Sequence, residues 1–316
     1  MKKYIITADD FGAEHFIDDA IYAAIEKGTV SCVSAFVTFQ SRPGSQDENS
    51  YIGSIKAIKA LHSKHPSIGI GLHLNFTTGF PIGDMYQTLA DERGRFHRME
   101  DFDFQNTKVH EVVVEIEHQI SVFKQLNIPI DHITCHHGLL NLWKPYWNEL
   151  IKILKRESIP VRNPVLISDS KWFKKKEGFR KSLMKKRGLR IGIRLIKDNG
   201  IIDLIKALAS KTGFSKAIRK KKLKTTDYFI DTFYGCPSIT QVKNIIKNGP
   251  QRNNVFSEFL VHLGKDTETS KAGKAVYGMD RVYAKQMRPK ETEVMLSDEV
   301  SELFQANLKL YSYSDL

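Results

Sequence analysis

The sequence predicts an α/β protein built from parallel strand-and-helix units, on three observations. Short apolar runs typical of strands alternate with segments of helical periodicity. About seven such units occur along the 316 residues, and that number is enough to close a barrel. Polar side chains follow the ends of five strands, where barrels of this kind carry their chemistry. The length suits one large domain or two smaller ones.

The predicted strands are short and rich in apolar residues. They cover residues 3–8, 31–38, 67–74, 132–135, 160–162, 227–230 and 255–263.

Amphipathic helices are predicted between several strands. The clearest has apolar residues at steps of four and three, namely Val109, Val113, Ile116, Ile120 and Phe123. Others are expected at residues 18–27, 53–62, 146–155 and 239–248. A last helix begins after Ser297 or Asp298, because either side chain can cap its first turn.

The composition is that of a globular protein, with 41% hydrophobic and 27% charged residues. No apolar run reaches the length of a membrane span, and the apolar stretch after the first lysines is too short for a signal peptide. The three cysteines, Cys32, Cys135 and Cys236, are odd in number and not in CxxC spacing. They indicate no disulfide framework and a reducing, cytoplasmic setting.

The net charge of +12 is concentrated in one segment. Between Lys171 and Lys224 there are 20 lysines and arginines but three acids, whereas the remainder has 28 bases and 33 acids. The chain is thus a mildly acidic body with a basic helical insert at about residues 168–225. Apolar side chains are interleaved with the bases: Trp172, Phe173, Phe179, Leu183 and Met184.

Three explanations of this insert are open. The plainest is a solvated helical pair beside the mouth of the barrel. The second is a helix that docks on anionic lipids through residues 171–224, which would place a cytoplasmic protein peripherally at the inner face of the membrane. Nucleic-acid binding, the third, is not expected because no nucleic-acid motif accompanies the charge.

The polar residues at the predicted strand ends are Asp9, Asp10, His73, Asn75, Cys135, His136, His137, Arg162 and His262. Taken singly, each has an ordinary explanation, such as a helix cap for Asp10 or a core histidine for His73. Taken together, one carboxylate and two neutral imidazoles are a ligand set for a divalent metal.

The adjacent pair in ITADDFG supports this interpretation, because like charges in contact are costly to bury. A cation would stabilise the pair if one aspartate binds it and the other stays free as a base. Metals at such sites activate water and polarise a carbonyl, while a histidine protonates the leaving group. His262 is suited to this last task, since an unperturbed imidazole has a pKa of about 6.5.

These motifs, in this order, resemble the YdjC-like carbohydrate deacetylase family, of the chitooligosaccharide deacetylase type. The segments that carry the resemblance are ADDFG (8–12), GLHLNFT (71–77), TCHHG (134–138), RNP (162–164), EFLVHLG (258–264) and the pair Arg288 and Glu291. Because the resemblance spans almost the whole chain, it implies a single domain over residues 1–316. The implied fold is a distorted (β/α) barrel of about seven strands that carries the basic insert.

The resemblance also implies a divalent metal, Mg²⁺ or Zn²⁺, held by Asp10, His73 and His136. Asp9 would be the general base and His262 the acid. Arg162 would orient the base or the substrate. The implied reaction is hydrolysis of an N-acetyl group from an amino sugar.

Three positions depart from the family pattern. Thr134 and Gly138 replace an aspartate and a second histidine, and Leu263 replaces a proline. The missing carboxylate would weaken the orientation of His136, and the missing histidine would alter the pocket or the substrate.

Two other functions are open on the sequence. One is a different metal-dependent hydrolase, such as a phosphoesterase, which often uses two metals. The other is a non-catalytic barrel that only binds a glycan. A homodimer is compatible with either function.

Overall fold

The computed structural model describes most of the chain. The described residues are 1–38, 54–84, 86–99, 101–166, 206, 209–231, 237–250, 254–265 and 287–316. Gly53, Cys236 and the interleaved apolar residues of the basic insert lie outside these ranges, so lipid docking by the insert stays a prediction. Within the insert, residues 209–220 are helical, and Phe214 stacks on Trp147 with ring centroids 5.7 Å apart.

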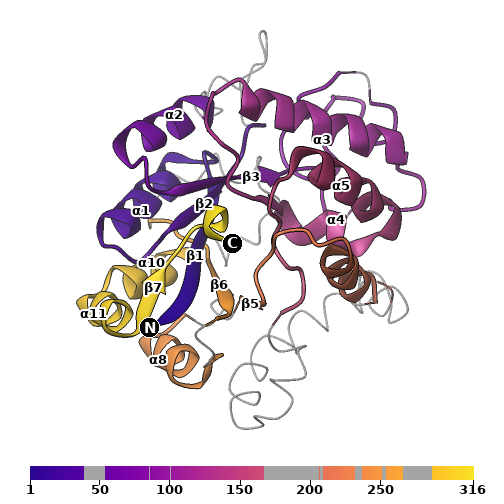
Figure 1. Cartoon of the computed structure of the whole chain (residues 1–316). Coiled ribbons are helices and arrows are strands. Elements are labelled where there is room, and N and C mark those ends of the chain that lie inside the picture. Colours follow the sequence, from indigo (N-terminus) through magenta and orange to yellow (C-terminus); the bar gives the residue numbers. More distant parts are fainter. Residues whose placement is uncertain are drawn as a thin grey trace.

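The predicted parallel α/β architecture is confirmed. Seven strands form one sheet in the order β4-β3-β2-β1-β6-β5, and β7 pairs with β1 beside this path. The strands are β1 (Lys2–Phe11), β2 (Cys32–Ala35), β3 (Gly69–Leu74), β4 (Ile133–Cys135), β5 (Tyr228–Ile230), β6 (Phe256–Val261) and β7 (Leu308–Leu310). All their pairings are parallel. Figure 1 shows the sheet curled into a half-barrel with helices around its outside.

The strand predicted at residues 160–162 is not formed. Val161 makes a single bridge to Ile133 of β4, and further on Leu166 makes one to Phe229 of β5. Prolines at 160 and 164 lack the N–H that a continuous ladder needs, which explains why the pairing stays local. The segment still spans the gap between β4 and β5, so it carries Arg162 to the inside of the curled sheet.

The helices that surround the sheet agree with the predicted segments and add to them. They are α1 (His15–Glu26), α2 (Ser54–Lys64), α3 (Val109–Lys124), α4 (Leu139–Leu142), α5 (Lys144–Glu157), α8 (Ile239–Asn248), α10 (Arg288–Leu296) and α11 (Asp298–Asn307), with the 3₁₀ turns η1 (His136–Gly138) and η4 (Tyr313–Asp315). Ser297 caps α11, because its side chain accepts a hydrogen bond from the N–H of Val300. Helix α10 was not predicted, although it supplies two residues of the site described below.

The inner side of α3 carries buried polar residues beside its apolar ones. Glu111 and Glu115 accept hydrogen bonds from backbone N–H groups of the loop after β3, those of Ile82, Gly83, Gln87, Thr88 and Leu89. Gln119 accepts from the N–H of Asn75 and donates to its carbonyl oxygen. The helix therefore fixes the course of the loop that leaves β3.

Replacing Glu111 by alanine is expected to lower the free energy of unfolding by about 2–3 kcal/mol, because buried N–H groups of the loop lose a charged acceptor. Urea unfolding at pH 7 would measure the change. The control is Glu117→Ala on the same helix, which removes a half-exposed pair with Arg156 and should cost at most about 1 kcal/mol. Equal losses in the two variants would contradict the role given to Glu111.

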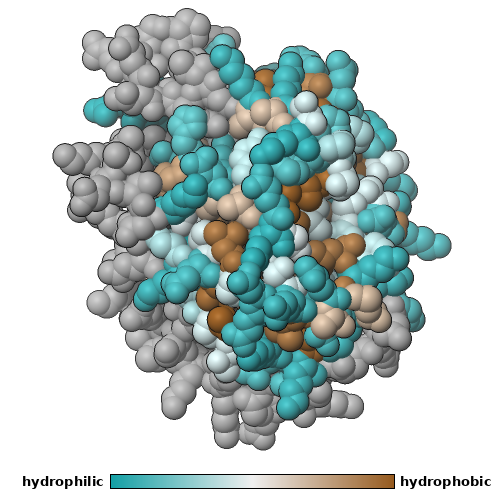
Figure 2. Space-filling model, turned by 90° about the vertical axis from the view of Figure 1, so that its left-hand side faces the viewer, coloured by the Kyte–Doolittle hydropathy of each residue, from teal (hydrophilic) through white to brown (hydrophobic). Residues whose placement is uncertain are grey.

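Within the described ranges, none of the helices has the length and apolar character to cross a bilayer. Figure 2 shows that one face of the molecule is mainly hydrophilic, with apolar residues scattered among the polar ones.

Candidate metal centre

The end of β1 departs from regular strand geometry and thereby turns two carboxylates toward one centre. Successive side chains of a strand normally point to opposite faces. Here the pairing with β2 shifts register between Ala8 and Phe11, and Asp10 has a positive φ of 72°. As a result, Asp9 Oδ2 and Asp10 Oδ1 lie 3.9 and 3.4 Å from the same atom, His73 Nε2.

The two oxygens of Asp10 have different surroundings. Oδ2 accepts a hydrogen bond from the guanidinium of Arg288. Oδ1 has no hydrogen-bond partner among the described residues, although it is buried and lies 3.2 Å from His136 Nδ1 and 3.4 Å from His73 Nε2. Burial raises the pKa of Asp10, but the charge of Arg288 and the two imidazoles outweigh it and hold the pKa well below its usual value. The carboxylate is therefore ionised and presents one free oxygen to two imidazoles.

The two histidines come from neighbouring strand ends and are held by their surroundings. His73 is the residue before the last one of β3, and its Nδ1 lies 2.6 Å from Thr134 Oγ1. When Nδ1 carries the proton that Thr134 accepts, Nε2 is left with a lone pair toward Asp10. His136 follows β4 in η1. The ring of Phe36 packs against both, with centroids 4.8 Å from His73 and 5.1 Å from His136.

Thr134 stands where the family pattern has an aspartate, and this difference was expected to weaken the orientation of His136. Its hydroxyl contacts His73 instead of His136. The substitution therefore bears on the orientation of His73, and the hydroxyl supplies the contact there.

The residues present fit a divalent cation. One atom from each of Asp10, His73 and His136 can be chosen so that all lie within 4.8 Å of one another, and all three residues are buried. An orphaned, ionised oxygen facing two imidazoles is costly to bury unless a cation completes the cluster. Carboxylate and imidazole donors are ordinary ligands for such an ion.

Asp9 and Arg162 form a bidentate ion pair. The terminal nitrogens of Arg162 donate to Asp9 Oδ2 at 2.7 Å and to Oδ1 at 2.8 Å. Its Nε donates to Glu258 Oε1 at 2.8 Å. Burial raises the pKa of Asp9, but Arg162 and then His73 outweigh it, so the pKa lies below its usual value and the carboxylate is ionised at neutral pH.

His262 follows β6 on the other side of β1. Its backbone N–H donates to Glu291 Oε2 at 2.6 Å. Burial lowers the pKa of the His262 ring, and the carboxylate of Asp10 partly offsets this effect. The ring is thus neutral at pH 7 in the resting site.

Arg288 and Glu291, the last motif of the sequence, lie in the first turn of α10. Residues three apart lie on one face of a helix, so both side chains point to the same region. Arg288 reaches Asp10 and the carbonyl oxygen of Leu263, while Glu291 binds the backbone of His262. The helix thus joins β1 to the end of β6.

Three of the polar strand-end residues do other tasks. Asn75 donates to the hydroxyl of Thr38 and to the carbonyl oxygen of Thr78, and so shapes the loop after β3. His137 Nδ1 lies 2.9 Å from the hydroxyl of Thr77. Cys135 accepts a hydrogen bond from a backbone N–H of α4.

A second buried cluster lies at the opposite, N-terminal ends of the strands and was not predicted. It contains Cys32, Asp131 and His132. Asp131 Oδ2 lies 2.8 Å from His132 Nδ1, and the carboxylate also accepts from the N–H groups of Tyr313 and Ser314. These contacts occupy both oxygens of Asp131, so we infer that the cluster holds η4 in place.

A family model described as YdjC-like protein matches residues 3–306. A protein of Clostridium beijerinckii named carbohydrate deacetylase is 20% identical over 99% of this chain and 100% of its own length. One of the same name from Brevibacillus brevis is 27% identical over 52% of this chain and 60% of its own length. The chain thus spans about three fifths of the length of that relative.

The fold has a close counterpart among solved structures. The crystal structure of a candidate cellobiose-phosphate cleavage protein from Enterococcus faecalis V583 superposes with a TM-score of 0.71 at 20% identity, covering 99% of this chain and 98% of that one. At this identity the likeness concerns the fold alone.

Proposed function

This chain belongs to the YdjC-like protein family, and on that basis we propose that it is a metal-dependent hydrolase that removes an acetyl group from an N-acetylated amino sugar. The observation that carries the proposal is the grouping of Asp10, His73 and His136 around one orphaned carboxylate oxygen, with Asp9 beside it. Relatives named carbohydrate deacetylase support the choice of reaction and substrate class.

Asp10, His73 and His136 would hold a divalent ion, which when bound polarises an amide carbonyl and lowers the pKa of water. Two imidazoles and one carboxylate favour Zn²⁺ over Mg²⁺, because Mg²⁺ prefers a shell of oxygen ligands. Arg288 keeps the other oxygen of Asp10 occupied, so the residue presents a single oxygen to the ion.

Asp9 would take the proton of the attacking water. It is ionised, and its two bonds to Arg162 fix the plane of the carboxylate. The pairing with Arg162 also makes Asp9 a weak base. The contribution of Asp9 to catalysis would therefore depend more on its position than on its proton affinity.

His262 would return a proton to the leaving amine. Because the ring is neutral at rest, it has to gain a proton during the reaction before it can donate one. The carboxylates of Asp10 and Asp9 favour that protonated form. The proton that Asp9 takes from water would therefore be the one that passes to His262 and then to the leaving amine, so that no other proton source is needed.

The function is tested by acetate release from a panel of N-acetylated sugars and oligosaccharides, with metal-free protein reloaded with Zn²⁺ or Mg²⁺. We expect one ion per chain by elemental analysis and acetate release that depends on it. Two ions per chain with phosphate-ester hydrolysis would favour a phosphoesterase. Sugar binding without acetate release would favour a non-catalytic glycan-binding barrel.

A further inference from the structure

We propose that Tyr313, in the 3₁₀ turn η4, is a positioning residue for Asp9, acting through Glu258 and Arg162. The inference rests on the proposed function, because the role of Asp9 as base comes from it. The segment after β7 would thus set the position of the Asp9 carboxylate from the opposite end of the strands.

A continuous chain of hydrogen bonds joins the two ends. The hydroxyl of Tyr313 donates to Glu258 Oε2. The other oxygen of Glu258 accepts from Arg162 Nε at 2.8 Å, and the two terminal nitrogens of Arg162 reach Asp9 at 2.7 and 2.8 Å. Tyr313 and Glu258 are fully buried, and the Arg162 side chain is 10% exposed.

Each contact restricts the next one. A guanidinium is planar, so a partner at Nε fixes the plane in which the other two nitrogens point. Glu258 is that partner, and its carboxylate would be free to turn about its last bond if only Oε1 were held. The Tyr313 hydroxyl holds Oε2 and removes that freedom. The ring of Phe229 lies 5.2 Å from the centre of the guanidinium and covers one of its faces.

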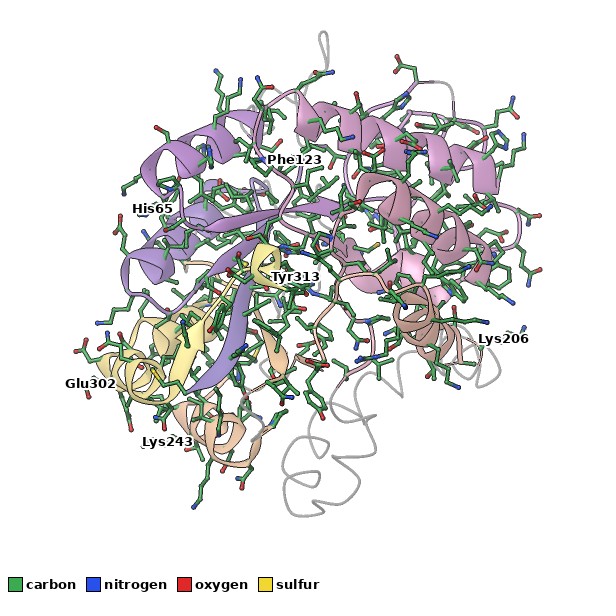
Figure 3. The ribbon with its side chains drawn as sticks, in the orientation of Figure 1. His65, Phe123, Lys206, Lys243, Glu302 and Tyr313 are labelled. Carbon is green, nitrogen blue, oxygen red and sulfur yellow. The ribbon has the colours of Figure 1, made fainter. Side chains whose placement is uncertain are left out.

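Tyr313 is itself held rigidly. Its backbone N–H donates to Asp131 Oδ2 at 3.2 Å, and the next N–H, that of Ser314, donates to Oδ1 at 2.9 Å. Its ring stacks on His132 with centroids 4.4 Å apart and an interplanar angle of 19°. Figure 3 labels Tyr313 beside η4 in the middle of the view, and the hydrogen bond to Glu258 places its hydroxyl against β6.

The alternative is that Tyr313 is an ordinary core residue whose hydroxyl merely satisfies a buried carboxylate. That role predicts a loss of stability and nothing more. A positioning role predicts a lower kcat with unchanged KM and unchanged metal content, because the base is displaced while the substrate and the ion keep their ligands.

The experiment is a double-mutant cycle of Tyr313→Phe and Glu258→Gln in the metal-loaded, full-length chain. We expect Tyr313→Phe alone to lower kcat by about 10-fold to 100-fold, as a displaced catalytic group does. In the Glu258→Gln background, Tyr313→Phe should have little further effect, because the chain is already interrupted. The matched control is Tyr146→Phe, which removes another buried hydroxyl, bonded to backbone carbonyls away from the site, and should leave kcat unchanged.

Unchanged kcat in Tyr313→Phe, or equal and additive losses in both backgrounds, would overturn the inference. Crystal structures of the wild type and of Tyr313→Phe give a readout that needs no activity: Arg162 should leave its two-pronged contact with Asp9 in the variant. If the wild-type chain releases no acetate from any sugar, the proposed function fails, and these structures alone decide the inference. An unmoved Arg162 would then refute it.

Discussion

Replacing Asp9 by asparagine is expected to lower kcat for acetate release by about 10³-fold, within the range contributed by a general base. The amide has nearly the shape of the carboxylate but cannot take a proton from water. It also loses the charge that pairs with Arg162. KM and bound metal should change little, because Asp9 is not among the proposed ligands. Steady-state kinetics on the zinc-loaded chain, with metal content measured in parallel, would test this.

The matched control is Asp19→Asn, on the outer side of α1, where the carboxylate forms an exposed pair with Lys265. It removes the same charge at a distance from the site and should leave kcat as in the wild type. Activity retained in Asp9→Asn would show that another group takes the proton. A loss that follows loss of metal would show that Asp9 is a ligand.

Replacing His136 by alanine is expected to lower the affinity for Zn²⁺ by about 100-fold or more, and to abolish activity at low metal concentration. His136 is suited to this test because its Nε2 makes no hydrogen bond within the described ranges and its Nδ1 faces the orphaned oxygen of Asp10. Its removal therefore breaks few contacts of the fold. Competition with a chromogenic chelator would measure the affinity.

The adjacent residue supplies the control. His137→Ala removes an imidazole that contacts Thr77 and packs on the ring of His136, with centroids 3.9 Å apart, but leaves all three proposed ligands in place. The affinity for Zn²⁺ should therefore stay within a few-fold of the wild type. Similar metal affinities of His136→Ala and His137→Ala would contradict the ligand set. A thermal melt of the metal-free forms would show whether either variant has lost its fold.

The elements of the barrel could be predicted because their patterns are local. In α3, the apolar residues Ile116, Ile120 and Phe123 recur at helical spacing and are buried as expected. Residues 160–162 were wrongly predicted as a strand because their composition resembles one. Pro160 and Pro164 limit the pairing there to isolated bridges. Strand β7 was not predicted, because it directly follows α11 and no glycine or proline separates the two elements in the sequence.

The grouping of Asp9, Asp10, His73 and His136 was predicted for a related reason. Asp9 and Asp10 lie near the end of β1, His73 lies near the end of β3, and His136 directly follows β4. Because parallel strands end at one edge of a sheet, topology alone brings them together. Arg162 was expected to orient the base or the substrate, whereas the hydrogen-bond partners of Asp10 and of Glu258 were not predicted. Arg288 and Asp10 are 278 positions apart, and Tyr313 and Glu258 are 55 apart.

Local patterns in the chain therefore established the strand-and-helix order and the residue types gathered at one end of the sheet. Only the packed molecule revealed which oxygen of Asp10 has no hydrogen-bond partner, that Arg162 is shared between Asp9 and Glu258, and how η4 reaches Glu258. The physical reason is that periodicity and strand ends follow from a few neighbouring residues. A buried charge, by contrast, selects its partner from whatever the folded chain brings within hydrogen-bond distance.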